Sequence, residues 1–74
     1  MNEEKNLNRL RIGQRIATIR KENGLTQEQL SQMTGLDRAN IGKIENGRYN
    51  VSIDILGKIC EALDCRIKIA EKED

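Results

Sequence analysis

The sequence predicts an all-α domain of four to five short helices, with one short β-strand after the last helix. Three observations support this prediction. Apolar residues recur at steps of three and four, the spacing of a helix that buries one face. Six glycines and no proline divide that pattern into short segments. Near the end the period changes to two, as in a strand. A chain of 74 residues is expected to form a single domain.

The first helix is expected to follow a flexible N-terminus. Residues 1–6 are polar and give no apolar anchor. From residue 7 onward the helical spacing is carried by Leu7, Leu10, Ile12, Ile16 and Ile19. Gly24 suits the left-handed position just after a helix, where Leu25 can fold back on the last turn.

The second helix begins with a capping signal. Thr26 followed by Gln29 fits a capping box, in which each side chain bonds the other residue's backbone N–H. Leu30 and Met33 are expected to face inward, and Gly35 ends the helix. The second helix is therefore predicted over residues 26–34.

The third helix, predicted over 37–46, has Asp37 as its expected N-cap. Ile41 and Ile44 form its inward side, and Asn46-Gly47 stops it. Ser52 is the expected cap of a fourth helix, whose apolar stripe is Ile53, Leu56, Ile59, Cys60 and Leu63.

A strand is predicted over residues 65–70. Apolar Cys65, Ile67 and Ile69 alternate with other side chains, and Asp64 suits the preceding bend. A lone strand needs a neighbour for its backbone groups, and the expected neighbour is the same strand of a second copy. The alternative is irregular chain packed on the first helix. The expected domain layout is a flexible segment 1–6, a globular part 7–64 and a dimerising tail 65–74.

Composition argues against an enzyme or a metalloprotein. The chain has no histidine and two cysteines, so no zinc site of Cys and His ligands can form. No thiol–base pair and no phosphate-binding glycine loop is evident, and no cofactor is expected. Two free thiols, no signal peptide and no long apolar run indicate a cytoplasmic chain without membrane contact. The net charge of +1 is uninformative, but four arginines and no acid lie between residues 9 and 20. That cluster hints at a polyanionic partner.

The two helices 26–34 and 37–46, joined by a turn with one glycine, have the spacing of a helix-turn-helix. The stretch "LTQEQLSQMTGLDRANIGKIENGR", followed by "SIDILGKICEALD", resembles the helix-turn-helix family of phage repressors and Cro proteins. The resemblance covers roughly residues 10–64. It implies a DNA-binding domain whose third helix, 38–46, enters the major groove. Two departures are Ser31, where the family often has alanine, and Val51, where proline is common.

The base-reading residues that this resemblance implies lie on the outward side of the third helix. They are Arg38, Ala39, Asn40 and Lys43. Arg38 suits guanine, whereas Asn40 suits adenine or a phosphate, and the sequence leaves that choice open. Gly42 would let the helix approach the DNA closely.

Other residues are expected to bind the DNA backbone. They are Gln27, Asn46, Arg48, Tyr49, Asn50 and, less directly, Arg15. The family also places an arginine of the first helix against a glutamate of the third. Arg20 and Glu45 are therefore expected to form a structural ion pair, and Glu45 is not a catalytic acid.

The resemblance implies a transcriptional repressor or autoregulator that binds double-stranded DNA in a sequence-specific way. It would act as a homodimer on a palindromic operator and need no small-molecule ligand. The expected dimer interface comprises Leu63, Cys65, Ile67 and Ile69. The strand-like tail tilts the resemblance towards antitoxins that bind a toxin partner, with stand-alone regulators and restriction–modification controllers as other possibilities. A different class of function is a protein-interaction module that keeps the fold without binding DNA.

Overall fold

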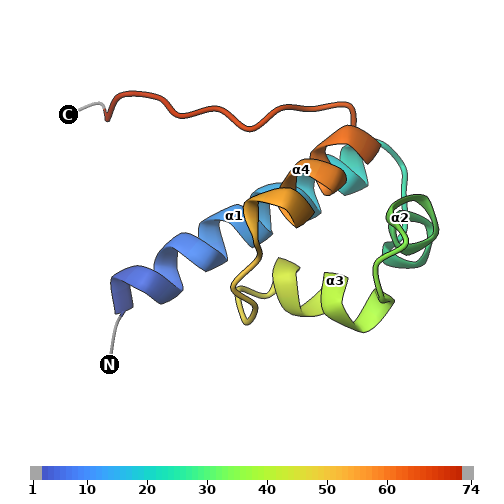
Figure 1. Ribbon diagram of the computed structural model, residues 1–74, viewed down its shortest axis with the longest axis horizontal. Helices are drawn as coiled ribbons and strands as arrows, with labels where there is room; N and C mark the ends of the chain where they lie inside the picture. Colours follow the sequence, from blue (N-terminus) through green and yellow to red (C-terminus); the bar gives the residue numbers. More distant parts are fainter. Residues whose placement is uncertain (1–2, 73–74) are drawn as a thin grey trace.

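The computed structural model describes residues 3–72, which contain four helices and no strand. They are α1 (Glu3–Glu22), α2 (Gln27–Thr34), α3 (Arg38–Glu45) and α4 (Ile53–Ala62). The all-α prediction is therefore confirmed. The three short helices gather around the C-terminal half of α1, whose N-terminal half projects beyond them (Figure 1). No helix within residues 3–72 has the length and apolar character needed to cross a membrane.

The C-terminal end of α1 matches the sequence prediction, whereas its N-terminal end departs from it. The helix begins at Glu3, inside the segment 1–6 that was expected to be flexible; residues 1 and 2 lie outside the described range. At the other end Gly24 has φ +72°. Its N–H donates to the Lys21 oxygen at 2.9 Å, and the N–H of Leu25 donates to the Arg20 oxygen at 3.1 Å. These are the two bonds of a Schellman ending, as Gly24-Leu25 predicts.

The predicted caps are present in two of the three short helices. Thr26 and Gln29 exchange both capping-box bonds. The Ser52 hydroxyl accepts from the N–H of Ile55 at 3.1 Å. Asp37 occupies the N-cap position of α3, but its side chain makes no capping hydrogen bond. The start of α3 is therefore set by the preceding turn rather than by the Asp37 carboxylate.

The core lies where the four helices meet, and its fully buried apolar residues are Ile16, Leu30, Ile41, Ile44, Ile59 and Leu63. Two inward assignments are wrong. Met33 is 53% exposed and Ile53, at the start of α4, is 71% exposed. Thr34 takes the inward place near Leu30, because four residues bring a helix closer to one face than three do. Its hydroxyl can be buried since it donates to the Leu30 oxygen at 2.8 Å.

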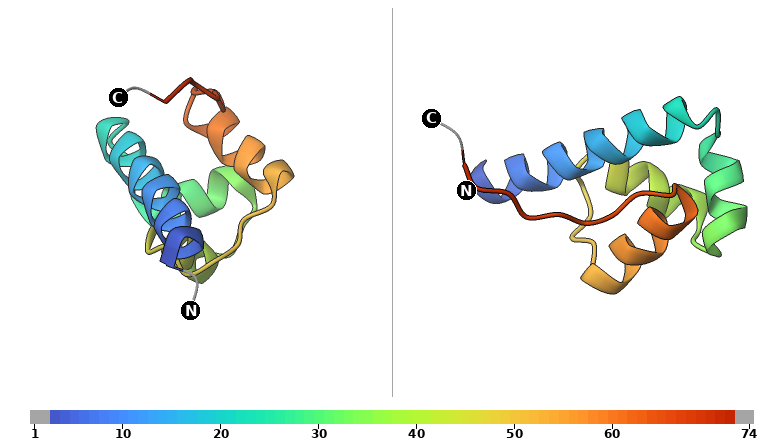
Figure 2. Two further views of the ribbon diagram at one scale, coloured as in Figure 1. Left: turned by 90° about the vertical axis from the view of Figure 1, so that its left-hand side faces the viewer. Right: turned by 90° about the horizontal axis from the view of Figure 1, so that it is seen from above.

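The strand predicted over 65–70 is absent. Beyond the left-handed bend at Asp64, which has φ +56°, residues 65–72 run as extended chain without ladder bonds. This segment, called the tail below, turns back along the molecule towards the N-terminal half of α1 (Figures 1 and 2). The alternating pattern gives the residues a strand-like shape but no neighbour to pair with. Leu63, expected in a dimer interface, belongs instead to the core of the single chain, whereas Ile69 is 96% exposed.

Candidate nucleic-acid interface

The turn between α2 and α3 is fixed by side-chain bonds as well as by its glycine. Gly35 has φ +76°, and its N–H donates to the Ser31 oxygen at 2.8 Å. The Ser31 hydroxyl donates to the Leu36 oxygen at 2.5 Å. The N–H of Leu36 donates in turn to the Thr34 hydroxyl at 3.2 Å. The serine that departs from the family pattern therefore ties α2 to the turn, which sets the angle at which α3 leaves it.

The third helix has a buried side and an open side, as its sequence predicts. Ile41 and Ile44 are 0% and 2% exposed and anchor the helix in the core. The open side is formed by exposed Arg38, Ala39 and Lys43, with half-buried Asn40 and Gly42 beside them. Two cations, an amide and a methyl group thus share one solvent-facing surface, which we call the α3 face. These are groups that hydrogen-bond or contact base edges and phosphates.

An ion pair joins the C-terminal end of α1 to the C-terminal end of α3. The guanidinium of Arg20 bonds the Glu45 carboxylate twice, with Nε–Oε2 at 2.6 Å and Nη2–Oε1 at 2.9 Å. Both side chains are largely buried, at 9% and 5% exposed. Arg20 Nη1 also donates to the Leu25 oxygen at 2.8 Å. The pair that the family resemblance implies is present, and it holds the loop before α2 as well as α3.

The electrostatic balance at Glu45 favours the charged form. Burial acts to raise the pKa of Glu45, but the hydrogen bonds from Arg20 and Gln27 outweigh burial and hold it below its usual 4.5. The hydrogen bond to Glu45 correspondingly raises the pKa of Arg20. The carboxylate is therefore a structural anion, with its oxygens directed at partners within the chain.

Gln27 belongs to the same network, which the sequence did not reveal. Its Nε2 donates to Glu45 Oε1 at 3.0 Å, so the first residue of α2 is tied to the last residue of α3. Its amide lies beside Gly42, where an added Cβ would come within 3.9 Å of both Nε2 and Oε1. An amide nitrogen carries two hydrogens, so Gln27 keeps one donor after bonding Glu45.

Two glycines bring α3 and the following loop against α1. A Cβ at Gly13 would lie 2.1 Å from the Ile44 oxygen, and one at Gly47 would lie 2.8 Å from the Cα of Leu10. Gly47 also has φ +75°. Gly13 is a functional position that was not predicted, although a glycine inside a helical pattern commonly marks a close helix crossing. Both glycines therefore set the height of the α3 face above α1.

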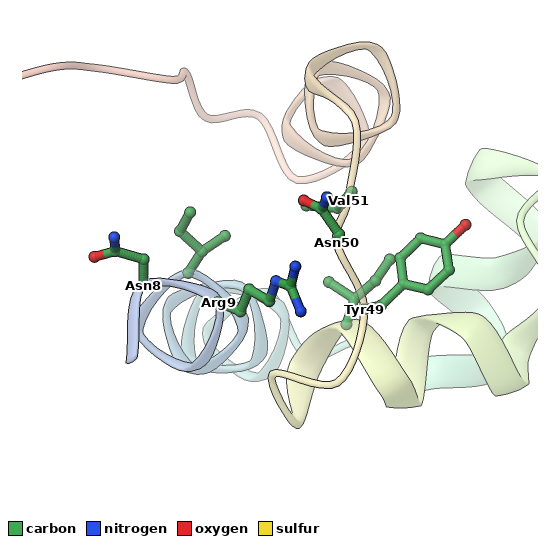
Figure 3. Close-up of a pocket in the computed structure, with 7 residues that line it drawn as sticks. Asn8, Arg9, Tyr49, Asn50 and Val51 are labelled. Atoms are coloured by element: carbon green, nitrogen blue, oxygen red, sulfur yellow. The ribbon is translucent and has the colours of Figure 1, made fainter. Parts of the chain in front are cut away.

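The loop after α3 carries polar side chains next to the α3 face. Asn46, Arg48 and Asn50 are exposed. Tyr49 is half-buried and its ring packs against the core, so only part of this side chain is open to a DNA contact. Figure 3 shows the ring lying along α3 with its hydroxyl pointing away from α1.

A pocket of about 190 Å³ opens between this loop and α1, lined by Asn8, Arg9, Ile12, Ile44, Tyr49, Asn50 and Val51. In Figure 3 the Arg9 side chain extends from α1 towards the loop. Arg9 is thus a cation beside Tyr49 and Asn50 of this loop, and only the charge cluster in the sequence pointed to it.

Arg15 lies elsewhere. It lines a groove of about 550 Å³ between α1, α4 and the tail, together with Arg66 and Lys68. The structure does not group it with the α3 face or with the loop that follows, which argues against a shared phosphate contact. Among the side chains that the structure describes, residues 7–72, no three potential metal ligands come together.

Comparisons with known proteins agree with this geometry. A family model described as helix-turn-helix matches residues 16–69. The chain is 40% identical over 63 residues to an immunity repressor protein of Bacillus phage phi105, covering 85% of this chain and 44% of that protein. It is 34% identical over 50 residues to the antitoxin PezA of Streptococcus pneumoniae, covering 68% of this chain and 32% of the antitoxin.

A solved structure matches over nearly its whole length. The crystal structure of the restriction-modification controller protein C.AhdI from Aeromonas hydrophila superposes with a TM-score of 0.79 and 38% identity. The match covers 81% of this chain and 91% of the controller. By contrast, the chain spans about half or less of the phage repressor and the antitoxin.

Proposed function

This chain belongs to the helix-turn-helix family of transcriptional regulators. We propose that it is a transcriptional repressor that binds double-stranded DNA in a sequence-specific way and acts as a homodimer. The observation that carries the proposal is the α3 face. Arg38, Ala39 and Lys43 are exposed on a helix whose opposite side is locked into the core. An α-helix with its side chains is about 10–12 Å wide, which fits the major groove of about 12 Å.

Within this proposal, the α3 face reads bases. Arg38 donates two hydrogen bonds to guanine O6 and N7, Lys43 reaches the same groove one turn later, and Ala39 contacts a thymine methyl. Asn40 is half-buried at the edge of the face, so it contacts either an adenine or a phosphate.

The backbone contacts come from both ends of the motif. Gln27 offers its remaining amide hydrogen and the N-terminal end of α2 to a phosphate, while Glu45 holds the side chain in position. Asn46, Arg48 and Asn50 meet the phosphates on the other side, with Arg9 beside them. Tyr49 contributes through its hydroxyl while its ring stays on the core. Arg15 is left out of this set because it lines the α4 groove.

The small area of the α3 face is the reason to propose a homodimer. One short helix contacts only a few base pairs, so a two-fold symmetric operator with half-sites about 34 Å apart supplies both specificity and a second set of phosphate contacts. The exposed apolar side chains of the tail, Ile67 and Ile69, are the proposed contacts between copies. Repression then results from covering a promoter.

The test is selection from a random duplex pool with the wild-type chain, Arg38→Ala, Lys43→Ala and Lys58→Ala. We expect a palindromic motif for the wild type. Arg38→Ala and Lys43→Ala should relax different positions of it, each by about 1–3 kcal/mol of discrimination. Lys58→Ala, which removes an exposed lysine from α4, should leave the motif unchanged.

The outcomes separate the proposal from a protein-interaction module. Enrichment of no palindrome, together with binding to random DNA that does not weaken with salt, would contradict DNA recognition. An unchanged motif with Arg38→Ala would remove only the assignment of Arg38 as a reader.

A second candidate function is that of an antitoxin, favoured by the similarity to PezA. That similarity covers 32% of the antitoxin, so it supports DNA regulation more directly than it supports toxin binding. The test is whether an adjacent gene arrests growth when expressed alone and loses that effect when this chain is co-expressed.

A further inference from the structure

The two cysteines meet at the end of α4, in a motif that the sequence pattern did not predict. Asp64 occupies the left-handed position at φ +56°. The N–H of Cys65 donates to the Cys60 oxygen at 2.9 Å, and the N–H of Asp64 donates to the Glu61 oxygen at 3.3 Å. These are the two bonds of a Schellman ending. In that motif the side chains in the positions of Cys60 and Cys65 regularly contact each other across the turn.

The backbone arrangement is suited to a disulfide. A backbone hydrogen bond joins the two cysteines directly, and the C3–C″ side-chain contact of a Schellman ending brings their side chains to the same side of the turn. Both thiols are free and half-buried. Burial and the neighbouring Cys65 thiol raise the pKa of Cys60 to about 11, which also reflects their proximity.

The groove beside the two cysteines favours a small oxidant with a negative charge. Cys60 and Cys65 both line the groove between α1, α4 and the tail. The charged side chains that line it are Arg15, Arg66 and Lys68, with no acid among the lining residues. A negatively charged small molecule would therefore be concentrated there.

We propose that Cys60 and Cys65 form a dithiol site that negatively charged low-molecular-weight disulfides oxidise to an intramolecular disulfide, fastening the root of the tail to α4. The Cys65 thiolate attacks the oxidant, forming a mixed disulfide and releasing one small thiol. The Cys60 sulfur, after losing its proton, attacks the Cys65 sulfur and releases the second small thiol, which takes up a proton. Two protein thiols are oxidised and one disulfide molecule is reduced to two thiols. The site does not depend on DNA binding.

The raised pKa of Cys60 assigns this residue to the second step. At neutral pH a group with a pKa near 11 is a thiolate in about one molecule in 10⁴, so Cys60 is a slow first nucleophile. Once Cys65 carries the small thiol, proximity makes Cys60 the resolving residue. The second step should accelerate as pH rises from 7 to 9.

The experiment incubates the full chain with oxidised glutathione and follows intact mass and free thiols. The wild type should give a single-chain product about 2 Da lighter than the reduced chain, with no glutathione attached. Cys60→Ser should stop at a mixed disulfide on Cys65. Cys65→Ser should react more slowly than Cys60→Ser, because burial still raises the pKa of Cys60 when the neighbouring thiol is gone. The rate with each oxidant is divided by the rate of the same oxidant with free cysteine. At low salt, this ratio should be smaller for the neutral 2-hydroxyethyl disulfide than for glutathione disulfide.

Other results would overturn the proposal. A wild-type product that keeps glutathione, or chains linked to one another on a non-reducing gel, would show that the two thiols do not pair. Equal relative rates for the charged and neutral oxidants would remove the role of the cationic groove. If a serine variant fails to fold, the mass of the oxidised wild type still decides whether the pair forms.

Discussion

The residue that sets the spacing between α1 and α3 is a glycine with no room for a side chain. We expect Gly13→Ala to lower the free energy of unfolding by about 1–3 kcal/mol, because its Cβ would lie 2.1 Å from the Ile44 oxygen. Gly57→Ala is the matched control, since Gly57 lies inside α4 with nothing within 4 Å of an added Cβ. It should raise stability by about 0.5–1 kcal/mol. Urea unfolding of both variants measures the difference, and shifts of the same sign would contradict the close crossing.

The carboxylate of Glu45 should make stability fall in acid. Its pKa is held below the usual 4.5, so its contribution is fully present above pH 4.5 and is lost as pH falls through the lowered value. At pH 7 we expect Glu45→Gln to be less stable than the wild type by on the order of 2 kcal/mol. The gap should shrink below pH 4.5. Glu61→Gln, at an exposed position of α4, is the control for removing a surface carboxylate. A constant gap from pH 7 to pH 3 would show that the charge of Glu45 is not responsible.

At the scale of elements, a substitution at Gly42 should change the stability of α3 and its proposed binding to DNA in opposite directions. A Cβ there meets only the Gln27 side chain at 3.9 Å, which is ordinary contact. Gly42→Ala should therefore stabilise the chain by up to about 1 kcal/mol through helix propensity. If α3 lies deep in the groove, the same methyl group should weaken operator binding. Thermal unfolding and a binding titration on one preparation give both numbers, and unchanged affinity would rule out close approach at this position.

The helices were predictable because their signals are local. Gly24 and the Thr26–Gln29 pair act within one turn, and the structure contains the endings that they predict. Met33 was misassigned because an eight-residue helix offers too few turns to fix its rotation. Asp37 makes no cap bond because the Ser31 and Thr34 hydroxyls already fix the turn before it.

The candidate site was predictable only in part, for a related reason. The period of Ile41 and Ile44 determined which side of α3 is open. The hydrogen bond from Gln27 to Glu45 joins distant parts of the chain, so no local pattern reveals it. A glycine inside a helical pattern suggests that a helix is crossed closely at Gly13, but not which element crosses it. Tyr49 lies among polar neighbours in the sequence, yet its ring packs against the core.

For the whole molecule, the tail is the segment whose structure depends on something outside one chain. Its alternation of Ile67 and Ile69 with charged residues is a strand pattern, but an isolated strand leaves its backbone groups unpaired. Within residues 3–72 the four helices are the only regular elements, and no second strand is present to complete a pair. Two apolar side chains of the tail consequently remain exposed, Ile67 at 43% and Ile69 at 96%.

The exposure of Ile69 allows the proposed dimer to be tested without disturbing the core. We expect Ile69→Lys to leave the unfolding curve of the monomer unchanged, because that side chain makes almost no contact within one chain. If the tails pair between copies, the same change should weaken dimerisation at least about tenfold, since it removes a buried apolar side chain and places a charge at the contact. Lys68→Ala, on the opposite side of the alternation, is the matched control. Light scattering over a dilution series measures the mass of each variant. A dimer of equal strength in Ile69→Lys would place the interface elsewhere, and the two-fold operator would then need a contact outside the tail.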